Sequence, residues 1–594
     1  MTALPPPSRT DLKEHLKSLI ERALHSLAAA GELSLPDPLP SIAIEPPRHV
    51  AHGDFSCNIG MLLAKACRKS PLAIANMIGA QIGIDESLEK IEVIAPGFIN
   101  FRLRQATIFR IIETLLRDPV NCGRSQRGAG RRIQLEFVSA NPTGPLHVGH
   151  GRGAAYGAAL ANLLRASGYQ VVTEYYVNDA GRQMDILALS VWLRYLERAG
   201  RAIDFPTNGY RGDYIIQMAA DVEAQYDRRF LPEHAGSLPA IAALANDEEV
   251  LDARIAHCRA TLGERDYQLI HAFACAAILC GIKDDLSAFG VEFDHWYSER
   301  SLTERGLLES ALERLRRTGY VFTKDGAEWF RSTAFGDEKD RVLIRENGVP
   351  TYFASDVAYH VDKFDRGFDK VVNIWGADHH GYIPRVKATL QALGLDPDRL
   401  EVLLVQFASL FRNGQKVQMS TRAGEFVTLS ELIAEVGVDA ARYFYSSRRS
   451  DQHLDFDLDL AKAQSQDNPV YYLQYAHARI CSVFRQVTQQ RGALDMRDGL
   501  AHLERLTEPR EHQLAALLAR YSGVVASAAE QREPHAIANF LRDVATEYHA
   551  FYNHHKINVD DVPLRLARLA LCAAVSLVLA HGLSLLGVSA PQEM

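Results

Sequence analysis

Two histidines lie three residues apart at the start of a predicted helix, in His147-Val-Gly-His150. Imidazole N–H groups and the unpaired backbone N–H groups of a helix start can hold a phosphate. Gly149 and the preceding turn Pro142-Thr-Gly-Pro145 would let the backbone approach such a ligand closely. Two other interpretations stay open. The pair could be half of a metal site, although the Glu and third ligand of HExxH spacing are missing, or two core histidines.

The elements around these histidines form a strand, a turn and a helix. Arg132–Val138 has the apolar character of a short buried strand, Asn141–Pro145 holds turn-forming residues, and Gly149–Arg165 has helical spacing. Gln170–Val177 follows as a second strand. The resulting βαβ unit favours parallel pairing with a right-handed crossover, and open parallel sheets bind ligands at their carboxyl ends.

The sheet is expected to resume further along the chain, with strands at Val371–Trp375 and Leu403–Phe407. Residues 182–315 are mostly helical and richly charged, and no strand alternation is expected before Tyr320–Phe335. These residues therefore form helices and an insertion that splits the α/β domain.

The two ends of the chain have different patterns. Leucines at helical intervals between residues 10 and 30, two further helices at Ile59–Cys67 and after Pro71, and alternation around the Pro-Gly turn in Ile91–Leu103 predict a compact α+β domain. From Thr428 the chain turns helical, and after Pro469 it is expected to be wholly helical.

Composition excludes several classes of protein. The 594 residues are 47% hydrophobic and 23% charged, as in ordinary globular proteins with several domains. The most apolar stretch, Leu564–Leu586, is interrupted by Arg565, Arg568 and His581 and predicts a buried helix. The first ten residues lack the pattern of a signal peptide. Eight cysteines without metal-ligand spacing predict reduced thiols in a cytoplasmic protein and no protein metal site.

The net charge of -8 means that any nucleic acid must bind to local basic patches. Each of the two candidates could equally be a solvated face or a boundary loop. They comprise Arg124, Arg127, Arg131 and Arg132, and Arg442, Arg448 and Arg449.

Several ordered motifs resemble one family. His147-Val-Gly-His150 is similar to the HIGH signature of class I aminoacyl-tRNA synthetases, and its surroundings resemble bacterial arginyl-tRNA synthetases. The HxGH motif alone is weak evidence for the family, but further motifs that occur in order along the chain make the resemblance strong. They are Glu136-Phe-Val-Ser-Ala-Asn141, Tyr175-Tyr-Val-Asn-Asp-Ala-Gly-Arg-Gln183, Tyr352-Phe-Ala-Ser-Asp356, Gly376-Ala-Asp-His-His-Gly-Tyr382, Met419-Ser-Thr-Arg-Ala-Gly424 and Asn468-Pro-Val-Tyr-Tyr-Leu-Gln-Tyr-Ala-His-Ala-Arg479.

The resemblance implies a fold and a reaction. The expected fold is a class I Rossmann-like α/β domain with a parallel sheet, an N-terminal α+β domain and a C-terminal all-α anticodon-binding domain. The expected boundaries are 1–107 for a domain that contacts the tRNA elbow, 108–465 for the catalytic domain, and 466–594 for the helical domain. A helical insertion at about 200–275 and a signature loop at 414–424 complete the catalytic domain.

The implied reaction is adenylation of L-arginine by ATP and transfer to the terminal ribose of tRNA(Arg). Mg²⁺ would accompany ATP without a dedicated protein site, and a monomer is expected. Helix-terminal N–H groups and imidazoles suit the charge that develops on the α-phosphate. The implied ATP-binding residues are His147, Gly149, His150, Asp378, Met419 and Ser420.

A guanidinium substrate needs planar acceptors, which carboxylates supply. By resemblance, Glu136 and Asp356 hold the guanidinium, although each could instead be a structural salt bridge. The remaining implied arginine-binding residues are Ser139, Asn141 and His147, which would orient the backbone end of the substrate, and Tyr352, which would pack beside its side chain.

The second signature departs from the family pattern. Where Lys-Met-Ser-Lys-Ser is usual, this chain has Gln418-Met-Ser-Thr-Arg422, so both lysines are missing. With His147 and His150, we expect Lys416 and Arg422 to be catalytic because they could supply the missing charge. The alternative is a solvated loop.

The helical C-terminal part contains the implied tRNA contacts. Tyr472, Tyr475 and Arg479 share one helical face, where core packing is the plain alternative to stacking on splayed bases. Tyr552 and Met594 match family positions near the anticodon loop. Two rival functions stay open: a tRNA-binding paralogue without catalysis, prompted by the altered second signature, and a small-molecule nucleotidyltransferase, which leaves the helical C-terminus without a task.

Overall fold

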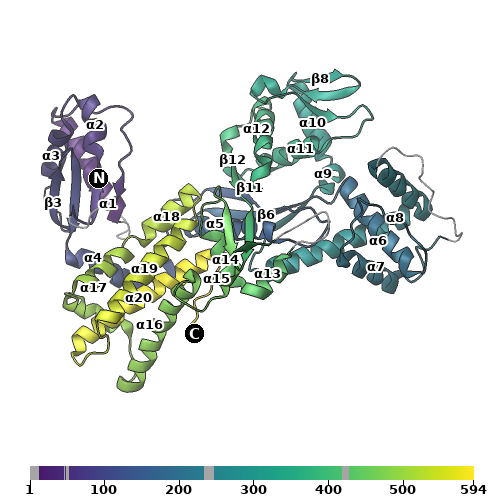
Figure 1. The fold of residues 1–594 in the computed structure, drawn as a ribbon. Helices are drawn as coiled ribbons and strands as arrows, with labels where there is room; N and C mark the ends of the chain where they lie inside the picture. The colour runs from purple at the N-terminus through teal and green to yellow at the C-terminus, as the bar shows by residue number, and fades with distance from the viewer. Residues whose placement is uncertain (1–11, 46, 48–51, 84, 233–246, 418–426) are drawn as a thin grey trace. The chain divides into compact units, whose positions relative to one another are not determined.

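A computed structural model describes residues 12–45, 47, 52–83, 85–232, 247–417 and 427–594. The chain divides into two compact units (Figure 1). One consists of Met1–Arg127, Ala166–Gly168 and Gln464–Met594, and the other of Gly128–Arg165 and Tyr169–Ala463. The signature residues Met419, Ser420 and Arg422 lie outside the described residues.

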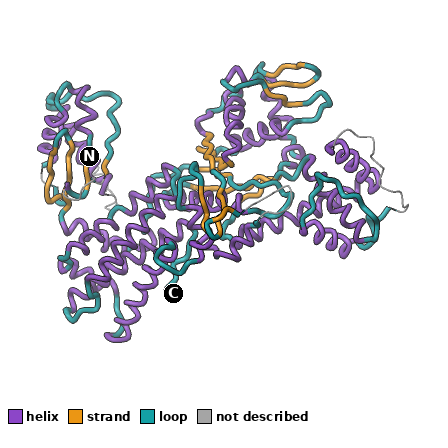
Figure 2. Tube along the Cα trace, in the orientation of Figure 1, coloured by secondary structure: helices purple, strands orange, loops and turns teal. Residues whose placement is uncertain are grey.

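The second unit is built on a five-stranded parallel sheet whose strands are orange in Figure 2. Its order is β12-β11-β5-β6-β7, so the strand order reverses between β5 and β11. Ligands bind at such a switch point, outside the carboxyl ends of the strands. The strands are β5 (Arg132–Glu136), β6 (Gln170–Val177), β7 (His295–Ser298), β11 (Lys370–Gly376) and β12 (Leu400–Val405).

Helices connect these strands in the order that the sequence predicts. Helix α5 (Val148–Ala166) joins β5 to β6, and α6 (Arg182–Arg198), α7 (Asp213–Tyr226) and α8 (Asp247–Ala288) lie between β6 and β7. Gly263 has non-helical dihedral angles, so α8 is two helices that meet at a kink. This confirms the helical character expected for the region after residue 182.

A smaller layer is inserted between β7 and β11. It contains a three-stranded antiparallel sheet in the order β10-β9-β8. Its elements are α9 (Arg300–Glu304), α10 (Leu307–Arg317), β8 (Val321–Lys324), β9 (Ala327–Phe330), η3 (Ser332–Phe335), β10 (Arg341–Ile344) and α11 (Tyr352–Asp365). Helix α11 begins after Thr351, whose side chain accepts a hydrogen bond from the N–H of Ala354.

The remaining elements of this unit follow β11. They are η4 (Ala377–Tyr382), α12 (Ile383–Ala392), η5 (Pro397–Arg399), β13 (Ala408–Arg412), β14 (Gln415–Lys416), α13 (Leu429–Val436), α14 (Val438–Ser446), β15 (Leu454–Asp457) and α15 (Leu458–Lys462). Strands β14, β13 and β15 form a second small sheet.

The first unit begins with a four-stranded antiparallel sheet in the order β1-β2-β4-β3. The Pro96-Gly97 turn joins β3 to β4, as the sequence predicts. The elements are α1 (Leu12–Ala29), β1 (Ile44–Glu45), β2 (Phe55–Cys57), α2 (Ile59–Cys67), α3 (Pro71–Ile82), β3 (Leu88–Ile94) and β4 (Phe98–Leu103).

Helices make up the rest of this unit. They are α4 (Gln105–Arg117), η2 (Pro119–Asn121), α16 (Pro469–Arg491), η6 (Met496–Arg505), α17 (Pro509–Leu518), α18 (Tyr521–Gln531), α19 (His535–His554) and α20 (Val562–Leu586). Within the described residues, α20 is long and apolar enough to cross a membrane, but 72% of its most apolar window is buried in the protein. The expected buried helix is confirmed.

Two strands lie in regions that the sequence predicted to be helical. β7 lies between residues 182 and 315, and β15 lies after Thr428. Both are only four residues long: β7, His-Trp-Tyr-Ser, has no alternation, whereas β15, Leu-Asp-Phe-Asp, alternates over too short a span to stand out. β7 pairs only with β6, at the edge of the parallel sheet.

Candidate active site

The turn after β5 has a strained backbone. Val138 and Ser139 have positive φ values of 68° and 42°, which a β-branched residue such as valine rarely adopts. Such conformations cost about 1–3 kcal/mol each and cluster at functional sites. The Ser139 hydroxyl donates to Glu136 Oε1 (2.9 Å) and accepts from the N–H of Tyr176 (3.1 Å). These bonds hold the strained turn against β6.

The two signature histidines stack on each other at the start of α5. Their ring centroids are 3.8 Å apart, with 27° between the planes. The backbone N–H of His147 donates to His150 Nδ1 (3.3 Å), and that of Gly149 donates to His147 Nδ1 (3.1 Å). Because each Nδ1 is an acceptor, the proton of each neutral imidazole lies on Nε2.

Both histidines are neutral at physiological pH. Burial lowers the pKa of His147, and burial together with the neighbouring His147 lowers the pKa of His150 to about 3. Neutral imidazoles can offer a phosphate their N–H groups but no positive charge.

The segment that follows the second signature is attached to the first. The N–H of Leu429 donates to Leu146 O (2.8 Å), and the N–H of Val148 donates to Val427 O (3.1 Å). The Tyr445 hydroxyl also donates to Val148 O (2.9 Å). Lys416, which we expected to be catalytic, is exposed at the end of β14.

An aromatic ring lies beside the signature glycine. Phe407 lies two residues beyond the carboxyl end of β12 and is 49% exposed. A Cβ atom added to Gly149 would lie 3.4 Å from this ring, and one added to Gly376 would lie 3.5 Å from it. The side chain of Asp378 folds back over Gly376 and is 59% exposed. These residues form an open aromatic platform at the switch point.

Two carboxyl groups share a site beside the turn. Burial, together with the charges of Glu299 and Glu136, raises the pKa of Asp356 to about 7, although a hydrogen bond with Tyr382 opposes this rise. Burial and the nearby Asp179 raise the pKa of Glu299 to about 7 as well. The described residues form no ion pair with either group. Two carboxyl groups with raised pKa values and no ion-pair partner among the described residues are candidates for binding a cationic ligand.

Other expected arginine-binding residues surround this pair. Tyr352 is 49% exposed at the first turn of α11, close to Gly181. The amide groups of Asn141 and Asn178 are hydrogen bonded at 3.1 Å. Asp179 accepts bonds from the Ser298 hydroxyl (2.6 Å) and the N–H of Arg300 (3.0 Å), and these bonds fix the residues on both sides of Glu299.

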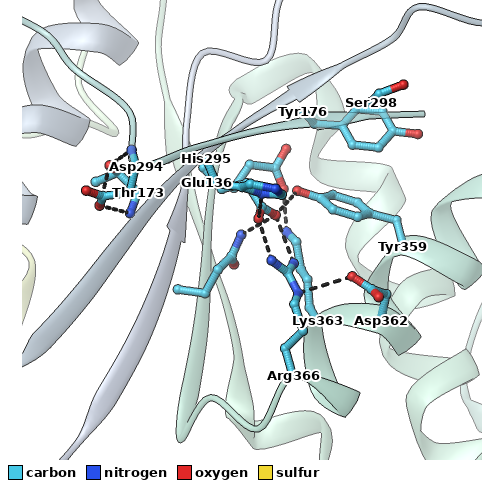
Figure 3. A network of polar contacts seen from close by, with 12 residues as sticks. Glu136, Thr173, Tyr176, Asp294, His295, Ser298, Tyr359, Asp362, Lys363 and Arg366 are labelled. Atoms are coloured by element: carbon cyan, nitrogen blue, oxygen red, sulfur yellow. Dashed lines mark hydrogen bonds and ion pairs between the residues drawn. The ribbon is translucent and has the colours of Figure 1, made fainter. Parts of the chain in front are cut away.

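Glu136 differs from Asp356 because it already has a cation. Lys363 Nζ lies 2.5 Å from Glu136 Oε2, and both side chains are buried (Figure 3). The structure therefore places Glu136 beside Glu299 and Asp356, but the negative charge of Glu136 is already paired with Lys363.

The expected tRNA-binding aromatics form a cluster in the first unit. Arg479 on α16 stacks over Tyr475 and Tyr552, 4.5 Å and 4.6 Å from their ring centroids. Its guanidinium also donates to the Tyr475 hydroxyl (2.8 Å). Tyr472 lies 4.6 Å from His549, centroid to centroid. Tyr552 is 37% exposed, so the cluster reaches the surface.

Met594 lies apart from this cluster. The preceding tail bonds to α16 through Gln474, His477 and Arg485. At 100° per residue these positions lie on the opposite side of the helix from Tyr475 and Arg479. Met594 itself is 54% exposed.

Two candidate residues escaped the sequence analysis. Glu299 follows the unrecognised strand β7, so nothing indicated that it reaches the sheet edge. Phe407 was expected to belong to a strand, whereas it lies just beyond one. The rule that parallel strands present ligand-facing residues at their carboxyl ends would have found both, once the strand ends were known. No group of three or more His, Cys, Asp or Glu side chains suited to a metal occurs in the described part of the chain.

Comparison with known families matches almost the whole chain. Residues 14–103 match the arginyl tRNA synthetase N terminal domain, and residues 473–594 match the DALR anticodon binding domain. Residues 111–205 and 242–461, more than half of the chain, match the catalytic domain of tRNA synthetases class I (R).

Two relatives are named arginine–tRNA ligase. The protein of Thioalkalivibrio sulfidiphilus is 54% identical and that of Halorhodospira halophila 53%, each over 98% of this chain and 100% of the relative. The solved arginyl-tRNA synthetase of Thermus thermophilus has the same fold, with a TM-score of 0.73 at 23% identity over 98% of this chain and 100% of the other. The chain belongs to the arginyl-tRNA synthetase family.

Proposed function

We propose that the protein ligates L-arginine to tRNA(Arg) at the expense of ATP. The observation that carries this proposal is the pair Glu299 and Asp356, two carboxyl groups with raised pKa values and no cation, next to the neutral HxGH histidines. A guanidinium can donate N–H hydrogen bonds in its plane to the ionised oxygens of both groups. Family membership supports the same reaction.

In the first step, an oxygen of the arginine carboxylate attacks the α-phosphorus of ATP. A new P–O bond forms, the bond to the pyrophosphate leaving group breaks, and arginyl-adenylate results. The Nε2–H groups of His147 and His150 donate to the phosphate oxygens whose negative charge grows. Ser139 and Asn141 orient the α-carboxylate and α-ammonium groups, and Tyr352 covers the aliphatic part of the side chain.

ATP lies across the switch point of the sheet. The adenine ring packs against the exposed ring of Phe407; His147 and Phe407 themselves fill the space beside Gly149. Asp378 accepts hydrogen bonds from the ribose. Mg²⁺ enters with the nucleotide and screens the β- and γ-phosphates, without a protein site of its own.

Two positively charged side chains replace the lysines of the usual second signature. Lys416 ends β14, and Arg422 follows in the segment that returns to the HxGH histidines at Val427. Both contribute charge to the pyrophosphate as it leaves. Separate Lys416→Ala and Arg422→Ala variants test this: the residue that acts there lowers kcat of arginylation far more than it changes the KM for arginine.

In the second step, the ribose of the terminal adenosine attacks the adenylate carbonyl and AMP leaves. Tyr472, Tyr475, Arg479 and Tyr552 hold splayed anticodon bases, with Met594 contacting the same loop from the chain terminus. Aromatic and guanidinium planes suit stacking, which contributes about 1–3 kcal/mol per base.

The N-terminal sheet offers a further tRNA contact. A cavity of about 520 Å³ opens beside β4, with the exposed ring of Phe98 in its wall. Asn58 Oδ1, also in the wall, has no hydrogen-bond partner within the described residues. An aromatic face beside an unused amide oxygen suits a single unstacked base of the tRNA elbow. The protein acts as a monomer in the cytoplasm.

The test is arginylation of tRNA(Arg), with arginine-dependent exchange between ATP and pyrophosphate measured with and without tRNA. We expect arginylation, and exchange that requires tRNA. Absence of arginylation with tRNA binding intact would instead support the non-catalytic paralogue. Exchange between ATP and pyrophosphate without tRNA would disprove only the requirement for tRNA. Truncation after Gln466 excludes the nucleotidyltransferase if it abolishes activity.

A further inference from the structure

A lysine is buried under the arginine pocket. The Lys363 side chain has no exposed surface, and its Nζ bonds to Glu136 Oε2 (2.5 Å) and to Asn373 Oδ1 (2.7 Å). It also lies 4.2 Å from the centroid of the Tyr359 ring. A buried ammonium group is retained only where its partners compensate for the loss of water. Figure 3 shows Lys363 with its partners Glu136 and Tyr359.

A directed chain of hydrogen bonds leads from Lys363 to the backbone of Asp356. Because Asn373 Oδ1 accepts from Lys363, its Nδ2 faces His360 Nε2 at 2.9 Å and donates to it. Burial lowers the pKa of His360 to about 3, so the ring is neutral. Its remaining proton therefore lies on Nδ1, which donates to Asp356 O at 2.8 Å.

The positive charge of Lys363 pairs with Glu136. The other carboxylate that faces it, Glu174 on β6, has its own cation: Arg366 lies 2.5 Å and 3.0 Å from the two Glu174 oxygens. Tyr359 also donates to Glu174 (2.6 Å), and Gln134 and His295 complete its shell. Arg366 also pairs with Asp362 (3.1 Å), so Glu136 is the carboxylate that Lys363 bonds directly.

We propose that Lys363 is a positioning residue for the arginine substrate. By neutralising Glu136 and orienting the α11 backbone at Asp356 through Asn373 and His360, it leaves Glu299 and Asp356, which form no ion pair with any described residue, for the guanidinium. This inference rests on the proposed function. Glu136 then serves the α-ammonium side of the pocket through its bond with Ser139, and not the guanidinium.

A purely structural ion pair would behave differently. Loss of Lys363 would lower the stability, but it would not change how arginine use depends on pH. If Lys363 sets the charge of the pocket, its loss exposes the ionised Glu136 to Asp356 and Glu299 and makes both harder to ionise. The groups that face Lys363 are Glu136 on β5, Glu174 on β6, Asn373 on β11, and Tyr359, Arg366 and Asp356 on α11.

The experiment compares full-length Lys363→Met, Glu136→Gln and the double variant, by kcat/KM for arginine from pH 6 to 9 with saturating ATP and tRNA. For Lys363→Met we expect a KM for arginine raised about tenfold, with the acid limb of the profile about one pH unit higher. For Glu136→Gln we expect the acid limb at or below its wild-type pH. In the double variant, the limb should return from the raised pH of Lys363→Met toward the wild-type pH. Lys370→Met, at a partly exposed lysine of the same sheet, is the control and changes neither.

Wild-type arginylation with no limb shift in Lys363→Met would overturn the inference while leaving the proposed function intact. The same holds if the double variant keeps the shifted limb. Thermal unfolding of each variant identifies misfolding, and the double variant, which removes both buried charges, keeps the test available if Lys363→Met alone does not fold. No arginylation by the wild type would reject the proposed function itself.

Discussion

Acidic side chains at the two ends of α11 differ in whether they have a cationic partner. At its start, Asp356 lies beside Glu299 with no cation, and the pKa of both carboxyl groups rises to about 7. Near its end, Lys363 and Arg366 pair with Glu136 and Glu174, and these bonds lower the pKa of Glu174 to about 2 despite its burial.

The contrast separates a binding site from a scaffold. A buried carboxylate with a cation holds elements together, here the helix and the strands β5 and β6. A buried carboxylate without one is costly in the empty protein and becomes favourable when a cationic ligand arrives. Both kinds occur within four turns of one helix, so the helix that is fixed to the sheet also carries the substrate site.

The largest effect is expected at the paired end. Glu174→Gln removes a buried negative charge that faces both Arg366 and Lys363, leaving Arg366 with Asp362 and Lys363 with Glu136, so the free energy of unfolding should fall by about 3–5 kcal/mol. Chemical denaturation measures this change, with Glu309→Gln, in an exposed pair with Arg316, as the control. A Glu174→Gln protein as stable as the control would show that the paired end is not a scaffold.

At the unpaired end, Asp356→Asn keeps the shape but removes a charge that faces the guanidinium. We expect arginine affinity to fall by about 2–4 kcal/mol, roughly 30-fold to 1000-fold in KM. Stability should not fall, because the empty protein loses a costly buried charge. Asp365→Asn, at an exposed position of the same helix, is the matched control. An unchanged KM would exclude Asp356 from the guanidinium site.

The raised pKa values also predict a pH dependence. Below about pH 7 both carboxyl groups of the empty site hold protons, and arginine must displace them. The kcat/KM for arginine should therefore rise from pH 6 to pH 7.5 and then level off. The free-energy equivalent of this rise is about 1.4 kcal/mol per pH unit for each group that titrates. Without arginine the sign reverses: folded carboxyl groups with raised pKa values lose stability as the pH rises from about 4 to 7. A flat kinetic profile would mean that the pair is already ionised.

The smallest effect tests the nucleotide platform outside this comparison. Phe407→Ala removes the ring beside Gly149 and should raise the KM for ATP about fivefold, or about 1 kcal/mol, with the KM for arginine unchanged. Tyr320→Ala, at another exposed aromatic residue of the same unit, provides the control. An equal rise of the KM for ATP and the KM for arginine would contradict a contact between Phe407 and the nucleotide.

The sequence predicted the elements whose patterns are regular. The apolar strand β5, the turn and the α5 helix could be recognised because their composition changes sharply at each boundary. β7 could not, because a short edge strand of mixed polarity has no alternation, and Glu299 was lost with it. Lys363 stands in the charged run Asp362-Lys363-Phe-Asp-Arg366, which resembles an exposed helix end. Only the register of α11 on the sheet shows that Lys363 points inward.

The attachment of Val427 and Leu429 to the HxGH segment limits how far the second signature can travel. Arg422 lies five residues from Val427 and five from Val417, whose N–H bonds to Leu410 O (2.9 Å). At about 3.4 Å per residue, its Cα stays within roughly 17 Å of either attachment point. A group tethered over so short a span acts at a high effective concentration, so the two attachments would keep Arg422 within reach of any ligand held by the HxGH segment.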